Sequence, residues 1–103
     1  PKKDDIVIMS IESINFGQTT LEAYRIHNVN ATILLIKAPN GALGCGYFDI
    51  NTANKCGDVM AIVRGVASFD DMMNAKVQEV SGKAAELGVT PGITGREALE
   101  KMC

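Results

Sequence analysis

The side chains that could do chemistry gather in one short stretch of the sequence. Cys45 lies between two glycines, Tyr47 follows two positions later, and Asp49 comes next. A thiol becomes a nucleophile where a base, a cation or a helix N-terminus lowers its pKa. Cys45 is therefore our candidate catalytic residue, the helix expected after Phe48 supplies a dipole, and His27, the one histidine, is the candidate base. The alternative is a small cysteine buried on a core strand, a common fate of free cysteines.

The same strand-to-helix junction is a candidate binding site for a small anionic ligand. A helix start presents unpaired backbone N–H groups, which favour an anion. We expect the principal pocket to be lined by some of Cys45, Tyr47, Asp49 and Asn54 and to be completed by a second subunit. The alternative is that the junction is solid core and that any pocket lies elsewhere.

Arg96 is the fourth candidate ligand-binding residue, together with Tyr47, Asp49 and Asn54. It follows a glycine-rich entry to a helix, so that a cation stands beside a helix N-terminus. Capping by Thr94 and Glu97 is the alternative, because it uses the same N–H groups, and we favour it.

The spacing of the metal-binding and nucleotide-binding residue types predicts neither a metal site nor a cofactor. Cys45 and Cys56 are 11 positions apart, and the chain has no CxxC or HxxxH pair. The glycines at 41, 44 and 46 do not follow the GxGxxG order of a dinucleotide-binding turn.

Composition limits the possible partners. Ten basic and twelve acidic residues give a net charge of −2, and 5% of the residues are aromatic. We therefore expect that the protein binds neither nucleic acid nor a charged membrane surface. The longest apolar run, residues 33–36, is too short to span a bilayer. Three irregularly spaced cysteines and the lack of a signal peptide in this sequence predict a cytoplasmic protein without disulfides.

The order of the elements predicts a single α+β domain over residues 1–103. Extended patterns fill the N-terminal half and helical patterns the C-terminal half. We expect a four-stranded, mostly antiparallel sheet with two or three helices packed on one face. The expected strands are 6–14, 19–26, 32–37 and 42–48, and the expected helices are 50–64, 68–87 and 94–102.

Two further expectations concern packing. Ala53, Gly57 and Ala61 recur every four residues, so we expect this stripe of the helix over 50–64 to pack on Gly44 and Gly46 of the fourth strand. With helices on one face, the other face of the sheet keeps apolar side chains such as those at positions 43 and 47. We therefore expect a homo-oligomer, most simply a dimer.

Four blocks of the sequence carry a family resemblance. They are Cys45-Gly46-Tyr47-Phe48, Ala53-Asn54-Lys55 with Gly57-Asp58, Asn74-Ala75-Lys76-Val77, and Thr94-Gly95-Arg96-Glu97-Ala98-Leu99. In this order the chain resembles the YunC-like proteins of archaea and bacilli, the family of domain of unknown function 1805. The resemblance implies a small α+β domain of a prokaryotic cytoplasm. It implies no activity and no catalytic residues.

Two functions remain open from the sequence. The first is a small cytoplasmic binding or assembly module of uncharacterised role that self-associates. The second is a thiol-dependent enzyme that acts on a small metabolite through Cys45. Whether the protein is an enzyme is not decided by these residues.

Overall fold

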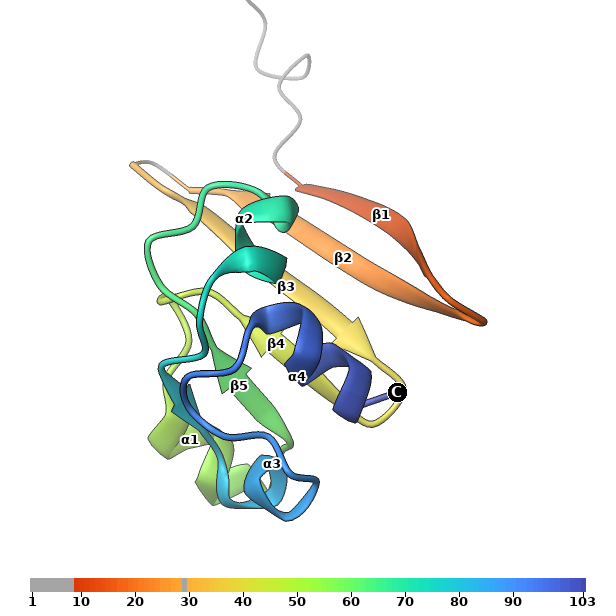
Figure 1. Ribbon diagram of the computed structural model, residues 1–103. Coiled ribbons are helices and arrows are strands. Elements are labelled where there is room, and N and C mark those ends of the chain that lie inside the picture. Colours follow the sequence, from red (N-terminus) through yellow and green to blue (C-terminus); the bar gives the residue numbers. More distant parts are fainter. Residues whose placement is uncertain (1–8, 29) are drawn as a thin grey trace, which may run out of the picture.

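The computed structural model describes residues 9–28 and 30–103, which build one six-stranded sheet with short helices (Figure 1). The strands are β1 (Met9–Phe16), β2 (Thr19–His27), β3 (Thr32–Ala38), β4 (Gly41–Gly44), β5 (Met60–Ile62) and β6 (Glu79–Val80). They lie side by side in chain order: β1 to β4 form an antiparallel meander, β5 pairs parallel to β4, and β6 is antiparallel to β5. The start of the strand expected at 6–14 lies outside the described residues.

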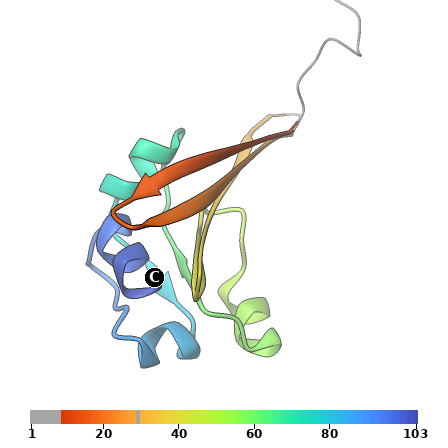
Figure 2. The same cartoon turned by 90° about the vertical axis from the view of Figure 1, so that its right-hand side faces the viewer.

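Helices cover both faces of this sheet. They are α1 (Ile50–Cys56), α2 (Phe69–Asn74), α3 (Gly82–Glu86) and α4 (Gly95–Lys101). Figure 2 shows α2 and α4 on one side of the sheet, here called the inner face, and α1 on the other, the outer face. The α+β class is confirmed, but two parts of the expected fold are wrong: the sheet has six strands and not four, and the helices are not confined to one face. In the part of the chain that the structure describes, no helix is long and apolar enough to cross a membrane.

The helix expected over 50–64 ends at Cys56, and its second half is strand β5. Gly57 ends α1 with a left-handed φ of 76°, a conformation that glycine adopts without steric cost. The stripe of small residues is therefore not one helix face. Gly44 is instead covered by the ring of Phe48, since a Cβ at Gly44 would lie 2.7 Å from Phe48 Cδ2. Gly46 is exposed and has the flexible Arg64 side chain as its neighbour.

The helix expected over 68–87 is also two helices with a strand between them. Its apolar spacing is real, but α2 ends at Asn74 and the chain is extended from Ala75. Ser81 explains why the second helix, α3, begins at Gly82. Its buried hydroxyl accepts hydrogen bonds from the N–H groups of Ala84 (3.2 Å) and Met60 (3.0 Å), and it donates to the carbonyl of Asp58 (2.7 Å). The serine thus caps α3 and ties it to β5.

The last helix is the one that the sequence predicts most closely. Thr94 Oγ1 accepts from the N–H of Glu97 (3.2 Å), and the Glu97 carboxylate accepts from the N–H of Thr94 (2.9 Å), which is a full capping box. The helix lies against the inner face of β4. Contact is close there, because Met102 is fully buried and its side chain fills the space in front of Gly41.

The outer face of β1 to β3 carries two apolar rows that run across the three strands. The register aligns Met9, Ile26 and Ile33 in one row and Ile11, Tyr24 and Leu35 in the next. We call these six residues the outer patch. Met9, Ile11 and Ile26 are 52%, 58% and 38% exposed. The expectation of an apolar face is thus met by other residues, because Leu43 is buried on the inner face and Tyr47 follows β4 in a turn.

Candidate functional site

Cys45 is buried in the hydrophobic core rather than open to solvent. Its side chain is 5% exposed, and it belongs to the main core cluster. Its N–H donates to the carbonyl of Leu34 (3.1 Å), and its Sγ accepts from the N–H of Leu34 (3.4 Å). The thiol therefore lies in the core, as in the alternative of a small buried cysteine. Among the described residues no basic side chain forms a hydrogen bond with this thiol, and His27 lies exposed at the end of β2. A catalytic role for Cys45 stays a prediction.

Tyr47 lies on the surface, in the turn between β4 and α1. It is 53% exposed, and its hydroxyl oxygen accepts a hydrogen bond from Asn28 Nδ2 (2.8 Å). The contact joins this turn to the end of the β2–β3 hairpin. Strand β4 ends at Gly44, so Cys45 and Tyr47 both lie beyond it and do not share a strand face.

Asp49 and Asn54 both hold helix ends in place. The Asp49 carboxylate caps α1, accepting from the Thr52 hydroxyl (2.8 Å) and from the N–H groups of Asn51 and Thr52 (3.3 Å each). The bond from the Thr52 hydroxyl, followed by the one from the Asn51 N–H, holds the pKa of Asp49 below its usual value. Asn54 Oδ1 accepts from the N–H of Gly82 (2.8 Å), which connects α1 to α3. The N–H groups expected to hold an anion are thus engaged by Asp49.

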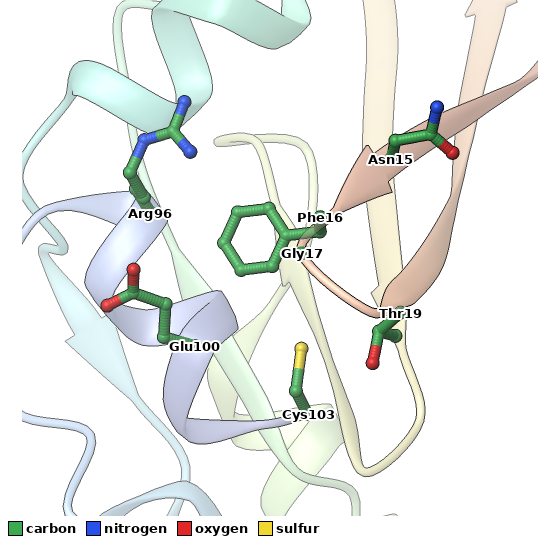
Figure 3. A pocket seen from close by; sticks show the side chains of 7 residues that line it. All are labelled: Asn15, Phe16, Gly17, Thr19, Arg96, Glu100 and Cys103. Atoms are coloured by element: carbon green, nitrogen blue, oxygen red, sulfur yellow. The ribbon is translucent and has the colours of Figure 1, made fainter.

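Arg96 is remote from this junction and lines a cavity of its own. The cavity measures about 370 Å³ and lies between the β1–β2 turn and α4 (Figure 3). Its lining comprises Asn15, Phe16, Gly17, Thr19, Arg96, Glu100 and Cys103. The guanidinium of Arg96 lies 5.6 Å from the centre of the Phe16 ring, and its Nη2 lies 3.5 Å from Met73 Sδ. None of the other candidate site residues lines this cavity.

A second cavity of about 350 Å³ continues the first one between the β1–β2 hairpin and α2. Asn15, Phe16 and Arg96 line both, so we treat the two as one site, the hairpin groove. In this second part Arg25 is already engaged. It pairs with Glu12 at 3.0 Å, and its guanidinium lies 4.8 Å from the centre of the Phe69 ring.

The outer patch holds a third cavity, of about 270 Å³. It is lined by Tyr24, Ile26, Ile33, Leu35, Lys37 and Phe48. At its edge the Tyr24 hydroxyl donates to Glu22 (2.7 Å), and this bond to a carboxylate raises the pKa of Tyr24 above its usual value. Lys37 Nζ lies 4.0 Å from the same carboxylate. The cavity is therefore apolar, with both signs of charge at one end.

Apart from Arg96, the sequence patterns did not indicate the residues of the groove or of the outer patch. A signal was present in the first strand, where Ile11 and Ile14 are both apolar yet lie on opposite faces. Apolar residues at both odd and even positions predict a strand with two apolar faces. Arg25 gave no comparable signal, because its stacking on Phe69 joins segments that are distant in the sequence.

Three comparisons place the chain among known proteins. The sequence pattern described as "Domain of unknown function (DUF1805)" matches residues 44–102. The "Uncharacterized protein YunC" of Bacillus subtilis is 34% identical over 67 residues, which are 61% of this chain and 66% of that protein, so the chain spans slightly less than two thirds of it. The crystal structure of a protein of unknown function, TA1206 from Thermoplasma acidophilum, superposes with a TM-score of 0.88 at 38% identity, over 92% of this chain and 93% of that one.

Proposed function

This chain belongs to the family described as a domain of unknown function (DUF1805), and on that premise we propose that it is a small self-associating module. The outer patch of one copy binds the outer patch of a second. The observation that carries this proposal is the pair of apolar rows across β1, β2 and β3, which no helix of the described chain covers. Contiguous exposed apolar surface of this kind marks an interaction site.

A second copy of the same chain is the partner that fits the chemistry of the patch. A two-fold interface sets each residue against the same surface on the partner, so the surface must complement itself. Next to the two apolar rows lies a polar one that contains Glu22 and Lys37, which have opposite charges. A two-fold axis can bring Lys37 of one copy toward Glu22 of the other. The apolar cavity lined by Tyr24 and Leu35 provides room for a side chain of the second copy.

We place this module in the cytoplasm. All three cysteines, Cys45, Cys56 and Cys103, are free thiols, and two of them are exposed. Exposed free thiols support a reducing compartment. The thiol-dependent enzyme remains the alternative, although the burial of Cys45 gives it no support.

The test is the mass of the particle in solution. Light scattering on the purified chain should return a mass larger than the 11.0 kDa of one chain, most simply that of a dimer. Ile11→Lys should shift the mass toward 11.0 kDa, because the substitution puts a charge into the interface at two symmetric places. Leu87→Lys is the matched control, since Leu87 is 42% exposed at the end of α3 and away from the sheet face.

Two results would overturn the proposal. One is a wild-type mass of 11.0 kDa at micromolar concentration. The other is an Ile11→Lys protein that keeps the wild-type mass. Circular dichroism checks the fold of each variant, and Ile26→Ser provides a second probe of the same patch should Ile11→Lys be poorly folded.

A further inference from the structure

We propose that the hairpin groove binds a free α-amino acid with an apolar side chain. Arg96 would take its carboxylate, Glu100 its ammonium group, and Phe16 would contact the apolar part. This site is separate from the outer patch, because α4 and the residues around it lie on the inner side of the sheet. The proposal therefore does not rest on self-association.

Arg96 differs from the other arginines of the described chain in its charge balance. Arg25 pairs with Glu12 at 3.0 Å and Arg64 with Glu79 at 2.5 Å, whereas no carboxylate of the described residues lies within ion-pair distance of Arg96. One of its five N–H donors contacts the Met73 sulfur. The guanidinium lies over the Phe16 ring, 5.6 Å from its centre, and its remaining donors can form a bidentate contact with a carboxylate.

Glu100 lies one helical turn after Arg96 on the same wall of the groove (Figure 3). Residues four apart on a helix are close enough to pair, yet these two do not. The guanidinium turns toward α2 and Phe16 instead, and the carboxylate stands apart from it. A cation and an anion are thus presented separately on a single cavity wall, which suits a ligand that carries both charges next to each other.

The charges of the whole groove favour a zwitterion over a simple anion. Its two arginines stand against three carboxylates: Glu12, Asp70 and Glu100. A small anion would add to this negative excess, whereas an amino acid brings no net charge. The volume of about 370 Å³ falls in the range of small-molecule sites, about 300–1,000 Å³.

Calorimetry with three related probes tests this assignment. L-Phenylalanine carries both charges, 3-phenylpropionate lacks the ammonium group, and 2-phenylethylamine lacks the carboxylate. We expect phenylalanine to bind about tenfold more tightly than either analogue, since each lost contact is a charge-assisted hydrogen bond at a partly exposed site. The Arg96→Gln protein should bind phenylalanine no more tightly than 2-phenylethylamine. The Glu100→Gln protein should bind phenylalanine no more tightly than 3-phenylpropionate. Lys101→Gln is the matched control, because it removes a charge from the same helix outside the groove.

Each outcome decides for or against the proposal. No binding heat with phenylalanine at millimolar concentration would overturn it, as would equal affinities for phenylalanine and 3-phenylpropionate. Unchanged binding by a folded Arg96→Gln protein would do the same. Arg96→Lys keeps the charge without the fork of donors and should bind at an intermediate level. Ile11→Lys should bind like the wild type, which separates this site from the outer patch.

Discussion

Gly95→Ala tests how closely α4 is packed against its neighbours. Gly95 is the first residue of α4, and it is buried. A Cβ at this position would overlap the carbonyl oxygen of Met72 at the end of α2, and it would lie 2.9 Å from Leu43 Cδ2. The obstacle is backbone, so a change of rotamer cannot relieve it. We expect α4 to move away from α2 and β4.

The magnitude follows from a comparison with Gly82→Ala. Gly82 is likewise the first residue of its helix and follows a serine cap, but a Cβ there would meet only Asn54 Oδ1, at 3.8 Å. Gly→Ala at a compatible site raises the free energy of unfolding by about 0.4–1 kcal/mol. Overpacking at Gly95 should lower it by about 2–3 kcal/mol. The two variants should therefore differ by roughly 3 kcal/mol.

Thermal unfolding at one fixed protein concentration is the assay, because the self-association proposed above would make the midpoint depend on concentration. The midpoint of Gly95→Ala should fall by about 8 °C or more, since a domain of this size loses about 4–8 °C for each kcal/mol. Gly82→Ala should match or exceed the wild type. A Gly95→Ala midpoint equal to that of the wild type would refute the packing argument, and so would equal losses in both variants.

Three further predictions concern helix ends. Asn54→Ala should lower the free energy of unfolding in urea by about 1 kcal/mol, because the N–H of Gly82 loses its acceptor, and an unchanged value would contradict this. Gly57→Ala should lower the free energy of unfolding by about 1–2 kcal/mol, because its φ of 76° is unfavourable for residues with a Cβ, whereas no neighbouring atom lies within 4 Å. Gly57→Ser should therefore lower it by the same amount. The N–H and then the hydroxyl of Thr94 lower the pKa of Glu97 below 4.5, so its contribution is complete above that pH and is lost as the pH falls through the lowered pKa. In the Glu97→Gln protein the free energy of unfolding should therefore fall less steeply at acid pH than in the wild type. Parallel pH dependences of the two proteins would exclude this role.

The sequence predicts the local parts of this fold well. Strands β2 and β3, the turn at Pro39 and the capping box of α4 each carry their signal within a few residues. Strands β5 and β6 do not, because three and two residues are too few to show alternation, and β5 is defined by its parallel pairing with β4. A spacing of four over residues 53–61 mimics a helix that Gly57 in fact ends.

The candidate site was less accessible to sequence reasoning than the fold. The sequence predicts Asp49 and Asn54 as ligand-binding residues, whereas in the structure Asp49 caps α1 and Asn54 links α1 to α3. Of the ligand-binding candidates, Arg96 lines the groove. Its position relative to Phe16 depends on how α4 docks against the β1–β2 turn, which is a tertiary contact that no local pattern encodes.

The contact between Met102 and Gly41 has a consequence for the order in which the protein is made. A ribosome releases β1 to β4 first, and the residues that cover their inner face, from α2 to Met102, come last. Leu21, Ile36 and Leu43, all fully buried in the finished protein, stay uncovered until then. The nascent meander thus has two apolar faces at once, a state prone to aggregation. Its inner face is covered only when synthesis has reached α4, which packs against β4.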